Sequence, residues 1–414
     1  MTATRVPTGR GASPRIARAI NDRLALRLLQ QEGPLTAGQL KELTGMSRPS
    51  VADLVERLQD SGLIEVVGES GAARRGPNAR VYGIVAGRAH VAGLDVRIES
   101  IAVEIADLLG RTVAHRELPV PAEADPARII EDGIDLLKGA AAAAGVDGLH
   151  TLAFGAPGLV DPVTGRLSPT GALPSWHGDL VDEVRKRLGV PVLLENEVNL
   201  AAVAEQRTGG AADGDDATFA LLWLGSGVGA ALMLDGRLRR GISGGAGEVG
   251  FLPLSTTGEL PTATDCDNGF HGMAGSRGVC ALAREHGLAV TADDARAAAD
   301  AVRAAAGAAQ EAGAATPPGA AGRAAEFLDA LAARIAVGVA SIVAVVDPGR
   351  VVLAGEVGQA GGRALADRVA DRLARLSPLR TAVQPTAVEG AAILRGAVIT
   401  AMDAAQDALF TPPE

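Results

Sequence analysis

The sequence predicts an α/β protein in which a small head, residues 1–86, precedes a two-lobed body, residues 87–414. Three observations lead to this prediction. The head alternates short helical and strand-like segments, and the body carries glycine-rich turns after apolar, strand-like segments. The charge also divides, since the head holds 12 Lys and Arg against 8 Asp and Glu, whereas the body holds 27 against 41. A basic head on an acidic body is typical of a polyanion-binding head, the alternative being chance variation in surface charge.

Composition limits the class of protein. The chain has 414 residues, 47% apolar and 21% charged, so it can bury a core and is long enough for two or three domains. Its two cysteines, Cys266 and Cys280, exclude a disulfide framework and suit a reducing cytosol. The basic first residues lack a secretory apolar run. The longest apolar stretch, residues 335–346, is too short to span a bilayer, so we expect a buried helix and a cytoplasmic protein that crosses no membrane.

Three helices are predicted in the head. Residues 15–31 form the first, which ends at Gly33. Its apolar side chains at helical spacing are Ile16, Ile20, Leu24, Leu28 and Leu29. Thr36 caps the second helix, and Ser47 caps the third, which carries Pro49 in its first turn, where proline is tolerated. The inward side chains expected on the third helix are Val51, Leu54, Val55 and Leu58.

Two strand-like segments, residues 63–67 and 79–85, follow the helices and enclose a basic, glycine-rich loop. Three helices and such a hairpin predict a winged helix-turn-helix, whose third helix enters the major groove of DNA by its N-terminal end. The expected DNA-binding residues are Thr36, Ser47, Arg48, Ser50, Asp53, Arg57, Arg74, Arg75 and Arg80. The alternative is a small helical domain that binds protein.

The body begins with a strand, a turn and a second strand, residues 91–113, with the pattern V-x-G-x-D ending at Asp95. This pattern resembles the opening hairpin of the actin/hexokinase-like nucleotide fold, in which later glycines let backbone amides approach a phosphate. Here Asp95 is followed by Val96, Arg97, Ile98 and Glu99, and Glu99 would repel a phosphate. We therefore expect that the phosphate loop is lost.

Polar residues gather where a second buried strand ends. Glu195, Asn196, Glu197 and Asn199 lie at the carboxyl end of that strand, where open α/β sheets bind ligands. A carboxylate there can hydrogen-bond to sugar hydroxyls or accept a proton from one. The alternative is a helix N-cap network. Trp176 precedes another helix and either floors a sugar site or forms a hydrophobic latch under a loop.

Glycine-rich turns supply the other side of the predicted cleft. Gly225, Gly227 and Gly229 lie between two strands, where backbone amides can cradle a phosphate, although a tight hairpin needs glycine anyway. Glu248 follows flexible glycines and is a second candidate ligand carboxylate. Gly355 ends a strand at a turn that is placed to lie under an adenine.

These motifs, in this order, resemble those of the ROK family of repressors, open reading frames and sugar kinases. The motifs are GAPG at 155–158, LENEVN at 194–199, LGSGVG at 224–229, GAGEVG at 245–250 and VVLAG at 351–355. The resemblance covers nearly the whole chain and implies an actin/hexokinase-like body. We expect one lobe from residues 87–200 with 390–414, and the other from residues 201–389. Regulators of the family bind DNA operators as homodimers or homotetramers and answer to sugars or phosphosugars, whereas its kinases phosphorylate hexoses with ATP and Mg²⁺.

Several residues of the family's kinase motifs are replaced. Only Asp95 remains of the phosphate motif D-x-G-x-T, and Glu197 stands where the family has its Asp base. The extra methylene moves the carboxylate by about 1.5 Å, and a misplacement near 1 Å costs on the order of 10²-fold in rate. Phe251 and Gly275 replace a His and a Glu that bind sugar. The resemblance therefore implies no catalytic residue and does not favour ATP binding.

The family's zinc motif is also degraded. It keeps Cys266, and one sulfur cannot form a closed tetrahedral site. The other three ligand positions hold Phe251, Asn268 and Met273. We therefore expect no metal and no cofactor, and a rescue by His271 with Asp265 or Asp267 stays open.

The sequence as a whole predicts a cytoplasmic regulator, with repression as the expected mode, that senses a sugar or related metabolite in a degenerate kinase cleft. Ligand-driven closure of the lobes would change the spacing of two recognition helices in a dimer. Three alternatives stay open: an active sugar kinase with a DNA-binding head, a DNA-binding protein that responds to no ligand, and a sensor of a non-sugar ligand.

Overall fold

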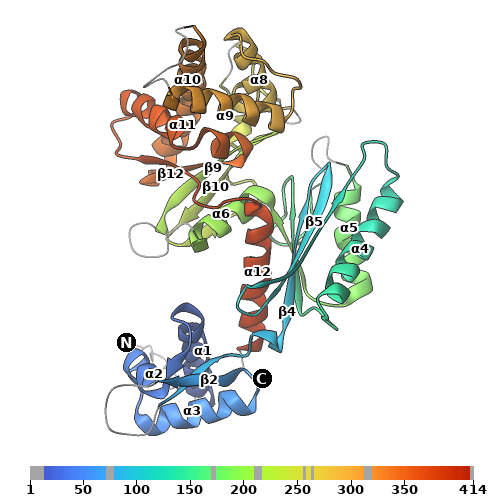
Figure 1. Ribbon diagram of the computed structural model, residues 1–414, viewed down its shortest axis with the longest axis vertical. Coiled ribbons are helices and arrows are strands. Elements are labelled where there is room, and N and C mark those ends of the chain that lie inside the picture. Colours follow the sequence, from blue (N-terminus) through green and yellow to red (C-terminus); the bar gives the residue numbers. More distant parts are fainter. Residues whose placement is uncertain are drawn as a thin grey trace, which may run out of the picture.

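The computed structural model describes residues 14–70, 79–168, 174–208, 217–254, 258–262, 265–311 and 319–410. It comprises a small head and two lobes of a larger body, with the head at the far end of the long axis (Figure 1). The last strand of the head ends at Ile84, and the first strand of the body begins at His90.

The head contains three helices and a three-stranded sheet of order β1-β3-β2. Its elements are α1 (Pro14–Gln31), β1 (Leu35–Thr36), α2 (Ala37–Thr44), α3 (Arg48–Asp60), β2 (Ile64–Ser70) and β3 (Ala79–Ile84). Thr36 caps α2 in a capping box with Gln39, and Ser47 caps α3 by accepting a hydrogen bond from the Ser50 amide. Both predicted caps and the predicted order of elements are therefore confirmed.

The predicted buried face of α1 is partly wrong. Ile20 and Leu24 are 58% and 40% exposed, whereas Ala25, Leu26 and Leu29 are buried. Several spacings of apolar residues fit one helix, and α1 turns the stripe that contains a small alanine toward α2, α3 and β3. The four inward side chains predicted on α3 are all buried, as expected.

Lobe 1 of the body is a five-stranded sheet of order β6-β5-β4-β7-β8. Its strands are β4 (His90–Val96), β5 (Ser100–Asp107), β6 (Thr112–Pro119), β7 (Thr151–Ala156) and β8 (Val192–Asn196). Helices α4 (Pro126–Ala143) and α5 (Trp176–Leu188) cover one face, and α12 (Ala392–Leu409) covers the other (Figure 1). Strand β4 pairs parallel with β7 and antiparallel with β5, so the loop after β4 and the end of β8 lie at the same edge.

Lobe 2 is a second five-stranded sheet, of order β11-β10-β9-β12-β13. Its strands are β9 (Phe219–Leu224), β10 (Val228–Leu234), β11 (Arg237–Arg239), β12 (Arg350–Ala354) and β13 (Ala382–Pro385). Helix α6 (Glu197–Thr208) packs against β9, β10 and α12, between the two lobes. The outer helices are α7 (Phe270–Ala274), α8 (Ser276–Glu285), α9 (Ala295–Glu311), α10 (Ala320–Val346) and α11 (Gly355–Leu376).

Helix α10 carries the longest apolar stretch of the chain. By length and composition alone, Ala321–Val346 would be long and apolar enough to cross a membrane. Leu331, Ile335, Val339 and Val343 nevertheless have no exposed surface and belong to the core of lobe 2. Burial in that core accounts for the apolar composition of α10.

Helix α12 connects the body to the head. Arg207 of α6 donates to Asp403 of α12 at 2.7 Å, and Gln406 of α12 donates to the Leu108 carbonyl at 2.7 Å. Near the end of α12, Asp407 pairs with Arg23 and Arg27 of α1. The same helix therefore contacts lobe 1, α6 and the head.

Candidate functional site

The exposed N-terminal end of α3 is the first candidate site. Ser47, Arg48, Ser50 and Asp53 are all exposed, whereas the opposite face of α3 is buried in the head. The Ser47 and Ser50 hydroxyls lie 2.8 Å apart and share a hydrogen bond. Helix α3 therefore presents exposed polar groups and one cation at the end where a recognition helix meets base edges.

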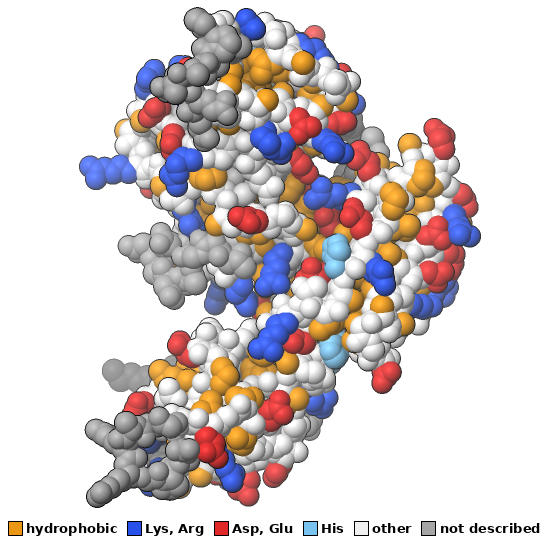
Figure 2. All heavy atoms as spheres, in the orientation of Figure 1, with side chains coloured by type: hydrophobic (Ala, Val, Ile, Leu, Met, Phe, Trp, Pro, Cys, Tyr) orange, Lys and Arg blue, Asp and Glu red, His pale blue; other side chains and the backbone are white. Residues whose placement is uncertain are grey.

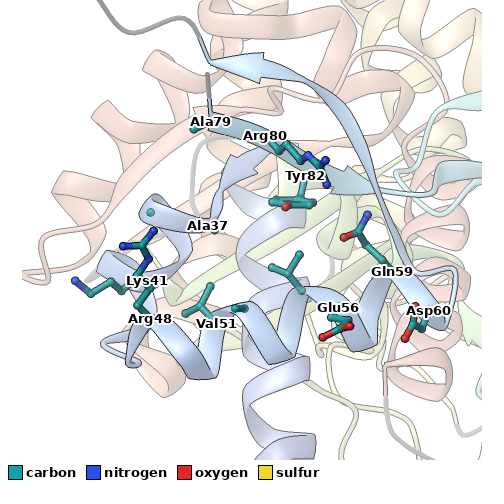
Figure 3. A pocket seen from close by; sticks show the side chains of 13 residues that line it. Ala37, Lys41, Arg48, Val51, Glu56, Gln59, Asp60, Ala79, Arg80 and Tyr82 are labelled. Atoms are coloured by element: carbon teal, nitrogen blue, oxygen red, sulfur yellow. The ribbon is translucent and has the colours of Figure 1, made fainter. Parts of the chain in front are cut away.

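A groove of about 710 Å³ lies between α2, α3 and β3 (Figure 3). Lys41 and Arg48 lie together at one end of this groove, and Arg80 of β3 reaches over it from the opposite side. Glu56 and Asp60 line the other end. The basic end therefore coincides with the N-terminus of α3, where a phosphate backbone would be favoured.

Arg57, Asp53 and Thr36, which the sequence assigns to DNA binding, are engaged with other residues of the head. Arg57 donates to Asp22 of α1 at 2.6 Å and pairs with Asp53 one turn earlier in α3. The hydrogen bond to Asp22 raises the pKa of Arg57 above its ordinary value. Thr36 is engaged in its capping box. Arg74 and Arg75 lie outside the described residues.

The second candidate site lies between the lobes of the body, at the carboxyl end of β8. Glu195 accepts hydrogen bonds from Arg240 at 2.5 Å and from the Asn199 side chain at 2.8 Å. The side-chain Oδ1 of Asn196 caps α6 by accepting a hydrogen bond from the Val198 amide, which is the N-cap role that the sequence left open. These side chains thus hold the end of the strand and the start of α6 in place.

Among the described residues, Glu197 has no hydrogen-bond or ion-pair partner, unlike Glu195, Asn196 and Asn199. Burial and the nearby charges of Asp95, Glu356 and Glu248 together raise its pKa to about 7, although Arg97 lowers it. Glu197 therefore remains available to a ligand in the cleft and exchanges a proton near neutral pH.

A chain of ion pairs crosses the cleft. Arg97, in the turn between β4 and β5, donates to Asp95 at 2.9 Å and to Glu356 of lobe 2 at 2.9 Å. These two carboxylates raise the pKa of Arg97, so it stays charged. Burial raises the pKa of Asp95. We call Asp95, Arg97 and Glu356 the interlobe bridge. Figure 2 shows acidic and basic side chains together along the seam where the lobes meet.

The glycine-rich turn does not fit a nucleotide phosphate. A Cβ atom built on Gly225 would lie 2.3 Å from Oε2 of Glu356, so the carboxylate of Glu356 lies directly against the turn. Gly355, with a φ of +78°, immediately precedes Glu356 and places it there. Gly227 lies against His271, and Gly229 lies in β10 against Val198. A phosphate at this turn would meet a carboxylate.

The residues of the former zinc motif do not fit a zinc ion either. Burial and the nearby Asp267 raise the pKa of the Cys266 thiol, which disfavours the thiolate that binds metal. His271 Nε2 lies 3.8 Å from Asp267 Oδ1. Within the described ranges, no three His, Cys, Asp or Glu side chains form a group that could hold a metal ion.

Trp176 belongs to the core of lobe 1. Its side chain is 4% exposed and packs with His177, with ring centroids 4.1 Å apart. A ring with so little free surface cannot stack on a sugar, so the geometry favours the hydrophobic latch over the sugar floor. Glu248, in contrast, is exposed, so its carboxylate is accessible to a ligand.

Sequence reasoning missed four charged residues at these sites. Lys41 joins Arg48 in the head, and Arg240 and Glu356 pair across the cleft with residues far away in the chain. The sequence places Arg97 only among the residues that follow Asp95 in the lost phosphate loop, and it predicts no partner for this side chain. The signal that indicates the pair of Arg97 and Glu356 is a basic residue in the lost phosphate loop together with an acidic residue directly after Gly355.

Comparisons with known proteins agree with this geometry. The model of the ROK family matches residues 91–404, and that of the MarR family matches residues 21–76. The xylose repressor of Bacillus spizizenii is 27% identical over 255 residues, which cover 60% of this chain and 64% of that protein. The DNA-binding transcriptional dual regulator NagC of Escherichia coli is 25% identical over 251 residues, 59% of this chain and 60% of that protein. The chain thus spans less than two thirds of the length of either relative.

Solved structures share the fold. A ROK family transcriptional regulator, homolog of the E. coli MLC protein, has a TM-score of 0.72 at 18% identity, over 95% of this chain and 98% of that one. A ROK hexokinase from Thermus thermophilus has a TM-score of 0.58 at 26% identity, over 77% of this chain and 99% of that one. The predicted fold class, a winged helix-turn-helix before an actin/hexokinase-like body, is confirmed. Because the family match extends over most of its length, the chain belongs to the ROK family.

Proposed function

We propose that this protein is a DNA-binding transcriptional regulator, with repression as its mode, that senses a sugar in the interlobe cleft and has no kinase activity. The observation that carries the proposal is the exposed N-terminal end of α3, which has Lys41, Arg48 and Arg80 around it in a winged helix joined to a ROK body. Its relatives include a xylose repressor and the regulator NagC, which supports operator DNA and a sugar as partners.

A continuous path leads from the cleft to α3. Helix α6 starts at Glu197 in the cleft, and Arg207 near its other end pairs with Asp403 of α12. Asp407, one turn further along α12, pairs with Arg23 of α1, and the neighbouring Asp22 pairs with Arg57 of α3. In our proposal, a ligand that moves α6 changes the position of α3 through these contacts.

The two recognition helices of a homodimer or homotetramer read two half-sites at a fixed spacing. A small rotation of each head against its body therefore suffices to release the operator. We place the protein in the cytoplasm, where the operator and the sugar are both present.

The absence of kinase activity, zinc and bound ATP belongs to the same proposal. Glu356 lies against the glycine-rich turn, and Arg97 already pairs with two carboxylates. A kinase would need both groups to make way for the nucleotide phosphates. Turnover of ATP with hexoses in a coupled assay would contradict this part of the proposal.

The test of DNA recognition uses the purified full chain and sheared genomic DNA from its own source. We expect enrichment of a palindromic motif beside genes for sugar transport or breakdown. A triple variant with Ser47, Arg48 and Ser50 changed to alanine tests the role of the recognition helix, and we expect this variant to lose the enrichment. Equal recovery of all fragments would contradict the proposal.

A further inference from the structure

The charges of the cleft restrict its ligand. We propose that the cleft selects a sugar without negative charge, in the order amino sugar, neutral sugar, sugar phosphate. This inference rests on the proposed function, because it names the chemical class of the ligand for the same cleft.

Carboxylates outnumber cations in the cleft. Asp95, Glu356 and Glu248 all lie close enough to Glu197 to act on it electrostatically. The cation among them, Arg97, already pairs with Asp95 and Glu356. Even when Glu197 is protonated, three carboxylates and one guanidinium leave an excess of negative charge, which repels an anionic ligand and attracts an ammonium group.

The second cation near the site offers no free charge either. Arg240 donates to Glu195 at 2.5 Å, and Glu195 is buried, with its other oxygen bound to the Asn199 side chain. A phosphate that recruited Arg240 would leave the buried Glu195 without its partner.

Two carboxylate oxygens at the interlobe bridge lack a donor. Oδ1 of Asp95 is buried and has no hydrogen-bond partner, and the Asp95 side chain is only 6% exposed. Oε2 of Glu356 is also buried without a partner. Sugar hydroxyls and an ammonium group supply the missing donors, whereas an ionised phosphate supplies only acceptors.

The interlobe bridge also occupies the place where an anion would otherwise bind. The carboxylate of Glu356 lies against Gly225 of the turn whose backbone would cradle a phosphate. Arg97 is directed to that carboxylate rather than to the open cleft. The protein therefore fills its own anion site with Glu356.

The test is isothermal titration calorimetry of the full-length protein with matched sugars. The first probes are D-glucosamine, D-glucose and D-glucose 6-phosphate. Two further pairs are D-xylose with its terminal phosphate ester and N-acetyl-D-glucosamine with its terminal phosphate ester. We expect D-glucosamine to bind more tightly than D-glucose, and the unphosphorylated member of any pair that binds to do so at least 10-fold more tightly than its phosphate ester. Tighter binding of D-glucose than of D-glucosamine would overturn the proposed order. Tighter binding of a phosphate ester would overturn the inference and leave sugar sensing intact. No binding by any probe, with DNA enrichment preserved, would overturn both the inference and the sugar-sensing part of the proposed function.

Two variants test the role of the interlobe bridge directly. Glu356→Gln and Asp95→Asn each remove one negative charge at nearly constant shape, so we expect each to shift the preference toward the phosphate ester by about 10-fold. Asp300→Asn, which removes one negative charge at an exposed position on the outer helix α9, is the control and should leave the preference unchanged. An unchanged preference in both folded variants would show that these carboxylates do not select the ligand.

Discussion

Arg57 of the recognition helix α3 donates a hydrogen bond to Asp22 of α1 at 2.6 Å, so this cation holds the head together. The side chains are 31% and 17% exposed, and Asp53 supplies a second carboxylate to Arg57 from within α3. Arg57 therefore differs from Arg48, which lies nine positions earlier on the same helix and is exposed.

Replacing Arg57 with alanine should lower the stability of the head and should have little effect on the electrostatic contacts between the head and DNA. Loss of a half-buried charge-assisted pair costs about 1 kcal/mol of unfolding free energy. We expect Arg57→Ala to lower the denaturant midpoint, while the salt dependence of DNA binding by the folded protein is unchanged. A flatter salt dependence with normal stability would assign Arg57 to the DNA backbone instead.

Replacing Arg48 with alanine should have the opposite result. If Arg48 neutralises one phosphate, its loss lowers the slope of log affinity against log salt by about 1 and weakens binding on all sequences. Fluorescence anisotropy on an enriched fragment at several salt concentrations measures this slope. Arg128→Ala is the matched control, since Arg128 is 75% exposed and belongs to α4, which packs on the sheet of lobe 1. Equal slopes for Arg48→Ala and Arg128→Ala would place Arg48 off the DNA.

The caps and the order of the elements are predictable from the sequence because each depends on a few neighbouring residues. Thr36 and Ser47 bond to amides three positions away. The buried face of α1 is less predictable, because burial of Ala25 instead of Ile20 depends on what α2, α3 and β3 present. Local pattern cannot choose between two apolar stripes on one helix.

The cleft shows the same division. The cluster from Glu195 to Asn199 is continuous in sequence and is predictable, although its capping role and ligand role cannot be separated. Arg97 and Glu356 are 259 positions apart, so their pairing depends on how the two lobes meet. The loss of glycines after Asp95 can be read from the sequence. That the carboxylate of Glu356 lies against the glycine-rich turn at Gly225 cannot be read from it.

Breaking the contact between α12 and α1 should loosen the head. Asp407 pairs with Arg23 and Arg27, and its side chain is 59% exposed, so loss of the pairs costs about 0.4 to 1 kcal/mol. We expect hydrogen exchange in α1 to become about two- to fivefold faster in Asp407→Ala. Asp300→Ala on α9, which removes another exposed paired aspartate, should leave α1 unchanged. Unchanged exchange in Asp407→Ala would remove this contact from the proposed path.

Glu197 should make the stability of the protein fall as the pH rises. Its pKa is about 7 in the folded protein against 4.5 ordinarily, so the folded state binds the extra proton between these values. The contribution of Glu197 to the stability of the folded protein is therefore greatest below pH 4.5. It declines as the pH rises from 4.5 through 7. We expect Glu197→Gln to be more stable than the original protein at pH 8, by on the order of 2 kcal/mol, and nearly equal at pH 4.

Thermal or denaturant unfolding at both pH values measures this effect. Glu99→Gln, at an exposed position, is the control. It should change the stability only slightly, and by the same amount at both pH values. Equal stabilities of Glu197→Gln and the original protein at pH 8 would show that Glu197 ionises freely in the cleft.

The most direct test of the central claim is the affinity of the full-length protein for its enriched DNA fragment, with and without the sugar that binds the cleft. The account predicts that saturating sugar weakens DNA binding at least 10-fold, and that Glu197→Ala keeps DNA binding but loses this response. DNA affinity that is unchanged by a bound sugar, or a Glu197→Ala variant that responds like the original protein, would contradict it.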